Sequence, residues 1–440
     1  MTPLAVRPEP LELGGCRVTE LARAAGTPAY AFDETGLREI CRRFRDSFRR
    51  AWPRSRVAYA CKAFAVGEML RLVTEEDLDL DVVSSGELAL ALRAGVPPER
   101  ITVHGSYKTP AELEFAVRSA VGRIVVDSVE ELADLAEVAR RCGLRQHILL
   151  RLNPGVEVST DARYRASGAE GKFGLRIAGG EAAAALATAR ALEVLEVDGL
   201  HFHLGSQLTT AEPYLLALRR VAEFLTRETP GWRPRWLVIG GGMGVHYVDE
   251  PMPPAPERWA DELVPGFRRW LAPLCADDVV LGIEPGRAIA APYGMLLYTV
   301  GLVRPAVRPG GSDLVVVDGG LSDNPRPLMY SARHQVVAAA APHVPASTTV
   351  NIYGRHCETD LLFADVPLPP VRRGDVLAVL TAGAYTHCMA SNYNRFCRAP
   401  VVFAANGTGR VVVRRETPAD LLATDLVETG PLVADGGGRR

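Results

Sequence analysis

The hydrophobic pattern along the first two thirds of the chain repeats with a regular rhythm. Short apolar segments of strand length alternate with longer stretches whose apolar positions recur at helical spacing. The strand-like segments are residues 57–62, 79–84, 101–105, 123–127, 147–152, 196–204, 236–240 and 279–284. The amphipathic stretches are residues 34–50, 67–76, 86–94, 110–119, 128–142, 180–191, 210–228 and 257–271. Eight such units over roughly 250 residues predict a (β/α)8 barrel, and an open doubly wound sheet is the alternative.

A different pattern follows residue 284. Strand-like segments separated by Gly/Pro turns predict a second, mostly β domain. These segments are residues 296–303, 314–318, 349–353, 375–380, 401–405 and 410–415. At the other end of the chain, a strand over 11–18 and a short helix over 19–25 precede the first unit. The predicted organisation is an N-terminal segment (1–28) packed with the β domain, a barrel (29–290), the β domain (291–425) and a disordered tail (426–440).

Composition and charge narrow the classes of partner. The chain has 440 residues, 50 basic and 52 acidic side chains and a net charge of -2, so no charge excess favours nucleic acid or a membrane surface. No apolar run has the length of a signal peptide or a membrane span. The eight cysteines form no CxxC pair and no metal-ligand spacing. We therefore expect reduced thiols, a cytoplasmic protein and no bound metal.

One lysine invites a chemical explanation. Only three of the 50 basic residues are lysines, Lys62, Lys108 and Lys172. Residues 57–63 are predicted to form a buried strand ending on Lys62, with Ala58 and Ala60 on the same face leaving room beneath the amine. Lysine, unlike arginine, can lose its proton and form a Schiff base with an aldehyde. The ordinary alternative is a surface lysine at the end of a strand.

Further chemistry follows the later strands. The active site of a (β/α)8 barrel lies at the carboxyl ends of its strands, and the loops after strands 7 and 8 commonly bind phosphate. The sequence places His104 at the end of strand 3, His203 on strand 6, a triple glycine (240–242) at the end of strand 7, and Glu284 with Arg287 at the end of strand 8. Pyridoxal 5'-phosphate requires a lysine, a phosphate site and a partner for its ring nitrogen. This combination therefore predicts pyridoxal phosphate as the cofactor.

The same residues carry a family resemblance that runs nearly from end to end. The chain resembles the fold-type III pyridoxal-phosphate decarboxylases through YACKA, LDVVSSGEL, PPERITVHG, GKFG, GLHFHLGSQ, GGGMG and EPGR. Three motifs of the second domain resemble the diaminopimelate decarboxylase branch: VDGGLSDNPRPLMY, HCETD and GAYTHCMASNYN. The resemblance implies decarboxylation of meso-2,6-diaminopimelate to L-lysine by a homodimer.

The resemblance also implies residue roles. Lys62 carries the cofactor, His203 stacks on its ring, Glu284 faces its ring nitrogen, and Cys357 donates a proton after CO2 departs. The implied cofactor-binding residues are Lys62, His203, Ser206, Gly240, Gly241, Gly242, Glu284, Gly286, Arg287 and Tyr385. The implied substrate-binding residues are Arg287, Arg326, Tyr330, Glu358 and Tyr385, with Cys357 and Glu358 reaching the partner subunit's site. His201 is interpreted as structural.

Two departures from the family pattern leave alternatives open. Residues 357–360, CETD, have one residue fewer between cysteine and aspartate than the expected CESxD motif. The segment HGSYK replaces the more usual HGNNK. Neither changes an implied catalytic position. A related decarboxylase that acts on another amino acid, such as ornithine, lysine or arginine, and a non-catalytic member that acts as a regulatory binding protein therefore remain alternatives.

Overall fold

The computed structural model describes residues 10–158, 166–168, 171–248 and 250–426. The segment expected to form a disordered tail lies outside the described residues from position 427 onward. Within the described part of the chain, no helix is long and apolar enough to cross a membrane.

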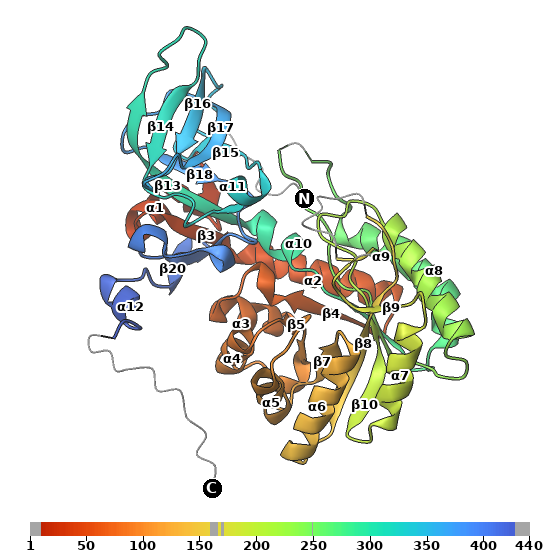
Figure 1. Cartoon of the computed structure of the whole chain (residues 1–440). Helices are drawn as coiled ribbons and strands as arrows, with labels where there is room; N and C mark the ends of the chain where they lie inside the picture. The colour runs from red at the N-terminus through yellow and green to blue at the C-terminus, as the bar shows by residue number, and fades with distance from the viewer. Residues whose placement is uncertain (1–9, 159–165, 169–170, 249, 427–440) are drawn as a thin grey trace.

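Eight parallel strands close into a barrel (Figure 1). They are β4 (Ser55–Ala60), β5 (Asp79–Val82), β6 (Ile101–Val103), β7 (Arg123–Val126), β8 (Gln146–Asn153), β10 (Leu195–His201), β11 (Trp236–Val238) and β12 (Val280–Ile283). Each strand pairs with the next one named, including β8 with β10, and β12 pairs with β4 to close the barrel. The open doubly wound sheet is thereby excluded. A short strand β9 (Leu175–Arg176) pairs in parallel with the carboxyl end of β8.

Helices cover the outside of the barrel (Figure 1). They are α2 (Glu34–Ala51), α3 (Gly67–Glu75), α4 (Ser85–Arg93), α5 (Pro110–Arg118), α6 (Val129–Cys142), α7 (Glu181–Ala191), α8 (Glu212–Arg227) and α9 (Pro256–Trp270). Their starts are set locally: the side chains of Ser84, Thr109 and Ser128 accept backbone N–H groups at the first turns of α4, α5 and α6. Each strand–helix unit predicted from the sequence is present.

The second sheet includes one strand, β3, from the N-terminal part of the chain. Its order is β17-β16-β14-β13-β3-β19-β20, and β18 pairs with both β13 and β15. Its strands are β3 (Ala29–Asp33), β13 (Gly294–Arg304), β14 (Asp313–Val317), β15 (Val336–Ala338), β16 (Thr348–Tyr353), β17 (Leu361–Leu368), β18 (Val376–Val379), β19 (Val401–Ala405) and β20 (Thr408–Val413). Residues 29–33, expected to belong to the barrel, form β3, which pairs with β13 and β19 and belongs to this sheet.

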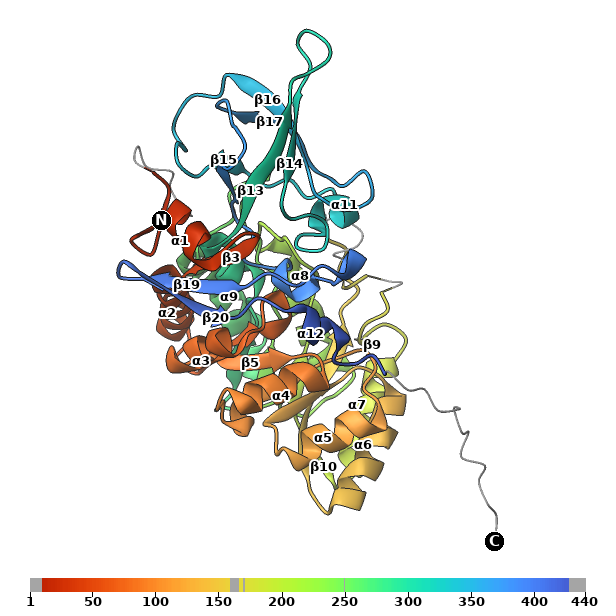
Figure 2. The ribbon, with the colours of Figure 1, turned by 90° about the vertical axis from the view of Figure 1, so that its left-hand side faces the viewer.

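The N-terminal segment packs on the same sheet. Its expected strand over 11–18 is wrong: Gly14 and Gly15 adopt positive φ angles of 57° and 80° and fold the segment into a hairpin of β1 (Glu12–Leu13) and β2 (Cys16–Arg17). Helix α1 (Val18–Ala25) follows. Leu11 donates its backbone N–H to the carbonyl oxygen of Ala339 at 3.0 Å, and the apolar side chains of the segment share a cluster with those of the sheet. Figure 2 shows α1 beside β3 and β13.

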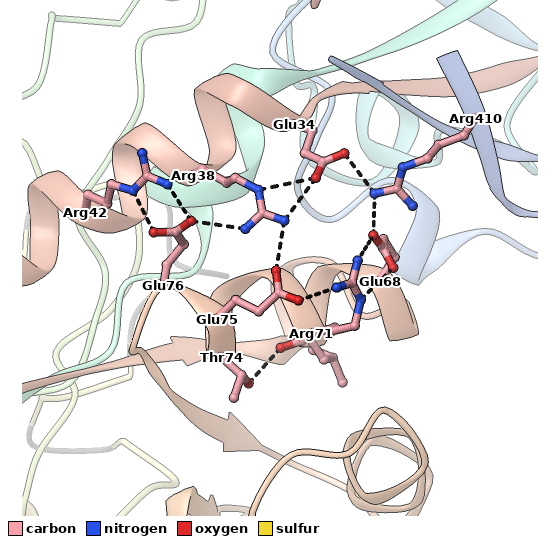
Figure 3. A network of polar contacts seen from close by, with 10 residues as sticks. Glu34, Arg38, Arg42, Glu68, Arg71, Thr74, Glu75, Glu76 and Arg410 are labelled. Atoms are coloured by element: carbon pink, nitrogen blue, oxygen red, sulfur yellow. Dashed lines mark hydrogen bonds and ion pairs between the residues drawn. The ribbon is translucent and has the colours of Figure 1, made fainter. Parts of the chain in front are cut away.

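An ion-pair network ties the sheet to the barrel helices (Figure 3). Arg410 on β20 donates to Glu34 of α2 at 2.8 Å and also to Glu68 of α3. The network continues through arginines of α2 and α3 to two further glutamates. Its other members are Arg38, Arg42, Arg71, Glu75 and Glu76. Because Arg410 belongs to one sheet edge and its partners to two barrel helices, this residue links the two parts of the molecule.

Replacing Arg410 by glutamine should lower the free energy of unfolding by about 1 kcal/mol at pH 7, the size expected for a partly exposed ion-pair network. Burial raises the pKa values of Glu34 and Glu68, but hydrogen bonds from arginines outweigh burial and lower both. A lowered carboxyl pKa stabilises the folded state above the unfolded value, about 4.3, and this stabilisation is lost as the pH falls through the folded value. The deficit of Arg410→Gln measured in urea should therefore vanish in acid.

The matched control is Arg414→Gln. Arg414 also pairs with a carboxylate, Asp420, but it follows β20 and bonds only within the C-terminal part of the chain. Equal stability of wild type and Arg410→Gln at pH 7 would contradict a linking role for this network.

Candidate active site

A cavity of about 410 Å³ lies at the carboxyl ends of the barrel strands. It contains eight of the residues predicted from the sequence: Lys62, His203, Ser206, Glu284, Arg287, Arg326, Tyr330 and Tyr385. Its other lining residues are Val83, His104, Gly105, Ser106, Arg151, Ala166, Phe173, His201 and Met389. Arg326, Tyr330 and Tyr385 come from beyond the barrel, so the second domain contributes one wall.

Lys62 lies in a 3-10 turn, Cys61–Ala63, immediately after β4. The strand ends at Ala60, so the expected alternation of side chains does not reach the lysine. Ala60 instead lies against Gly286, where an added Cβ would stand 2.9 Å from the alanine Cβ, and Ala58 lines a separate small cavity at the opposite end of the barrel. The prediction of empty space beneath the amine is therefore wrong. The amine reaches the cavity because the turn carries it beyond the strand.

A buried carboxylate accompanies the amine. Lys62 Nζ donates to Oδ2 of Asp81 on β5 at 3.0 Å, and the Asp81 side chain is fully buried. Burial lowers the pKa of Lys62, but the charge of Asp81, together with Tyr385 and Glu284, outweighs burial and raises it above its ordinary value. The amine is therefore held in its protonated form until another group takes the proton.

Glu284, directly after β12, lies between two imidazoles. His201 Nε2 hydrogen-bonds Oε2 of Glu284 at 3.1 Å, and His104 Nε2 lies 3.2 Å from Oε1. Burial raises the pKa of Glu284, but the two imidazoles outweigh burial and hold that pKa well below its usual range. The site therefore contains an ionised carboxylate in a nearly water-free position, which is possible because polar partners approach both oxygens.

His203 offers an uncharged ring to the cavity. Burial lowers the pKa of His203 well below its ordinary value, and the charges of Lys62 and Arg151 lower it further. Its Nδ1 accepts the backbone N–H of Gly241 at 3.3 Å, so the proton of the neutral ring is on Nε2. An apolar, uncharged face of this kind suits stacking against a flat aromatic ligand.

The triple glycine is required by close packing of the backbone. An added Cβ would lie 2.6 Å from the Phe202 carbonyl oxygen at Gly240 and 1.9 Å from the Glu284 carbonyl oxygen at Gly241. At Gly242 it would lie 2.1 Å from the Gly205 carbonyl oxygen. Larger residues would push apart the ends of β10, β11 and β12. These glycines thus allow the backbones after β10, β11 and β12 to pack closely, but the three of them and Gly286 are not among the residues that line the cavity.

Two arginines supply positive charge. Arg287, at the start of the short helix α10 (Arg287–Ala290), donates to Ser206 Oγ at 3.2 Å and Tyr247 Oη at 3.1 Å, and its guanidinium lies 4.6 Å from the centre of the Tyr385 ring. Arg326 begins α11 (Arg326–Tyr330) and is only 2% exposed. Its Nε has no hydrogen-bond partner among the described residues. A buried guanidinium with an unused donor on a cavity wall is a site for an anion.

Cys357 and Glu358 do not line this cavity among the residues that the structure describes. Both are exposed in the loop between β16 and β17. The backbone N–H of Cys357 donates to Asn394 Oδ1 at 3.3 Å, and Glu358 accepts a hydrogen bond from the Tyr393 hydroxyl. The structure of one chain thus separates these two predicted residues from the eight that line the cavity.

Sequence reasoning missed several residues of the site. Asp81 and Arg151 were not selected, His104 was noted only as a strand-end residue, and His201 was interpreted as structural although it bonds Glu284. Arg151 Nη1 lies 3.3 Å from Asp127 Oδ1. Polar positions inside otherwise apolar strands were the available signal, because such groups are rarely buried without a partner.

The residues present fit pyridoxal phosphate. The cavity volume falls within the range of small-molecule sites, and an amine, an ionised acid, an uncharged imidazole and a guanidinium face it together. The unused Nε donor of Arg326 shows that the described residues alone do not satisfy this polar wall. Lys62 would bind the cofactor's aldehyde, and Glu284 would face its ring nitrogen.

Comparison with known proteins agrees with this geometry. The family model "Pyridoxal-dependent decarboxylase, pyridoxal binding domain" matches residues 37–291. A diaminopimelate decarboxylase of Actinosynnema pretiosum subsp. auranticum is 42% identical over 434 residues, which cover 96% of this chain and 95% of the relative. One from Bacillus methanolicus is 38% identical over 409 residues, covering 92% and 94%. The crystal structure of the M. jannaschii diaminopimelate decarboxylase in complex with L-lysine has a TM-score of 0.89 at 30% identity, covering 97% of this chain and 99% of that one.

The barrel, its amine-bearing cavity and the matching family model define a pyridoxal-dependent decarboxylase. The relatives are similar over both the barrel and the β domain, beyond the segment that the family model matches. The chain belongs to the diaminopimelate decarboxylase family.

Replacing Asp81 by asparagine should lower the pKa of Lys62, because the largest influence that raises it is removed while burial remains. In cofactor-free protein at pH 8, Lys62 should then react faster with an amine-directed reagent, by about tenfold for each unit of decrease. Mass spectrometry of the labelled peptide measures this rate. Asp79→Asn is the control, since Asp79 is on the same strand but pairs with Arg56. An unchanged rate in Asp81→Asn would contradict the described ion pair.

Proposed function

We propose that this protein decarboxylates meso-2,6-diaminopimelate to L-lysine and CO2 with pyridoxal phosphate. The observation that carries the proposal is Arg326, a buried guanidinium on the wall of the cavity that contains Lys62. Diaminopimelate has an amino group and a carboxylate at each end, so the end that does not react requires a cationic partner for its carboxylate. The names of the relatives and the L-lysine complex of one structural neighbour support the same substrate.

The barrel residues would bind and poise the cofactor. When bound, pyridoxal phosphate accepts the electron pair that remains on the substrate carbon after CO2 leaves. Lys62 supplies the amine that attaches to its aldehyde. Glu284 is ionised and could hold a proton on the ring nitrogen, while the uncharged ring of His203 would stack on the cofactor. Ser206 and Arg287, the turns at Gly240, Gly241, Gly242 and Gly286, and Tyr385 of the second domain would form the remainder of the cofactor site.

Residues of the second domain, together with Arg287 of the barrel, would recognise the substrate. Arg326 and Arg287 are suited to bind carboxylates, with Tyr330 and Tyr385 beside them on the cavity wall. Glu358 would bind the distal ammonium, and Cys357 would donate the proton that replaces CO2 on the reacting carbon. These two residues are the ones that a single chain leaves outside its own cavity.

The alternatives account less well for this cavity. As substrates, ornithine, lysine and arginine place their single carboxylate at the reacting carbon and have none at the distal end. Their decarboxylation would therefore leave Arg326 buried without an anion, which is costly. A non-catalytic binding protein would have no need of an amine paired with a buried acid at the cavity wall.

A panel of amino acids tests the proposal. The holoenzyme is incubated separately with meso-diaminopimelate, L-lysine, L-ornithine and L-arginine, and released CO2 is measured. Diaminopimelate should exceed the others in kcat/KM by at least about a hundredfold, since a site with buried polar groups rejects substrates that leave them unpaired. The control is Lys62→Ala, which should release no CO2. Equal or faster release from a substrate without a distal carboxylate would contradict the proposal.

We also propose a cytoplasmic homodimer with composite active sites. All eight cysteines are free thiols, as expected in a reducing compartment. Cys357 and Glu358 are exposed, and a twofold dimer would allow each chain to present them to the cavity of its partner. Each site would then combine a barrel from one chain with a loop from the other.

Mixing two inactive variants tests this arrangement. Lys62→Ala and Cys357→Ala are combined under conditions that exchange subunits. Each mixed dimer then has one site that lacks both residues and one site that is intact. At equal mixing half of the dimers are mixed, so activity should recover to about a quarter of wild type by mass action. A mixture that stays inactive despite demonstrated exchange would show that Cys357 serves its own chain or has no catalytic part.

A further inference from the structure

The loop that contains Cys357 and Glu358 is anchored at both ends. His356 and Asp360 are buried, whereas the three residues between them are exposed. His356 Nδ1 lies 2.6 Å from Asp360 Oδ2, and Asp360 also accepts the backbone N–H of Leu321 at 3.1 Å. We call residues 356–360 the presentation loop. Its buried ends fix the base, but they do not by themselves orient the exposed side chains.

A second segment, residues 391–396, orients the exposed residues of the presentation loop. Tyr393 stacks on the imidazole of His356, with ring centroids 5.6 Å apart and an interplanar angle of 20°. The Tyr393 hydroxyl donates to Oε1 of Glu358, and Asn394 Oδ1 accepts the backbone N–H of Cys357 at 3.3 Å. Two adjacent residues therefore contact both of the residues that the loop exposes.

The geometry of this second segment is unusual and locally fixed. Asn394 has a φ of 52°, a left-handed conformation that asparagine tolerates better than most residues. Asn392 Nδ2 donates to the Phe396 carbonyl oxygen at 3.1 Å, and Ser391 donates its N–H to the Ser322 carbonyl oxygen at 2.9 Å. A tight turn alone would not require a hydroxyl on the exposed ring of Tyr393. The partner of that hydroxyl is a carboxylate that otherwise stands in solvent.

We propose that Tyr393 and Asn394 are positioning residues that set Glu358 and Cys357 for the active site of the partner subunit. The inference rests on the proposed composite site. A free glutamate side chain loses rotational entropy when it binds a ligand, and a hydrogen bond made beforehand reduces that cost. The bond from Tyr393 occupies Oε1 of Glu358, which leaves Oε2 for the distal ammonium of the substrate. Asn394 accepts a hydrogen bond from the loop backbone and so fixes the backbone position from which the Cys357 side chain extends.

The same segment also touches the chain's own site. Tyr385 and Met389 line the cavity, and the chain reaches Tyr393 only four residues after Met389. One stretch of the β domain thus forms a wall of its own cavity and orients the residues offered to the other. Both active sites of a dimer would depend on it.

The test replaces Tyr393 by phenylalanine, which keeps the ring on His356 and removes only the hydroxyl. KM for meso-diaminopimelate should rise about fivefold, the cost of ordering one flexible side chain, while kcat changes by less than about twofold. The Kd of the holoenzyme for L-lysine, measured by calorimetry, should rise by a similar factor, because L-lysine retains the distal ammonium. A general loss of structure would lower kcat and the melting temperature instead.

A double-mutant cycle isolates the contact. In Glu358→Ala there is no carboxylate to orient, so adding Tyr393→Phe should raise KM and the L-lysine Kd no further. The matched control is Tyr353→Phe, which removes a tyrosine hydroxyl on β16 outside this pair of segments and should leave both constants unchanged. If KM and the L-lysine Kd were unchanged in Tyr393→Phe but raised in Glu358→Ala, the inference about Tyr393 would be overturned and the composite site would stand. Unchanged constants in Glu358→Ala would overturn the composite site and the inference with it.

Discussion

An ionised carboxylate inside the mouth of the barrel is the constraint on which the site depends. Glu284 is 6% exposed, and such a charge is tolerated only when polar partners replace water. Its partners are His201, the last residue of β10, and His104, the residue after β6. Neither strand is a neighbour of β12 in the sheet. Only closure of the barrel brings these three strand ends together. The fold therefore creates the charged centre, and the charged centre in turn favours a closed barrel.

A second buried acid balances the amine across the same cavity. Asp81 bonds Lys62, and its other oxygen lies 3.6 Å from His104, which also approaches Glu284. Lysine, aspartate, imidazole and glutamate thus form one continuous row of polar groups. A change of charge at Lys62 alters the electrostatic potential at Glu284, because the distances are short and the surrounding dielectric constant is low. This coupling suits a site in which a cofactor bridges the amine at one end and the acid at the other.

The architecture and much of the site could be predicted from the sequence. All eight barrel strands were found, because strands buried on both faces appear as uninterrupted apolar runs. Strand β17 was missed, since its sequence LLFADVPL contains a proline and alternates buried with exposed positions irregularly. Strand β3 was missed because its partners β13 and β19 are distant in sequence. For the same reason spacing could not assign Asp81 or His104: their roles arise from neighbours on other strands. The turn at Lys62 shows that a strand's end cannot be fixed to within two residues by its apolar pattern.

The most direct test of the account is the site of covalent attachment of the cofactor. The holoenzyme is reduced with borohydride, digested, and analysed by mass spectrometry for the peptide that carries the pyridoxyl group. The chain offers only three lysines, and Lys108 is buried against Glu131 and two backbone carbonyls. The account predicts modification of Lys62 and none of Lys108 or Lys172. A cofactor fixed on either of the other lysines, or a protein that binds pyridoxal phosphate without any reducible bond, would contradict it.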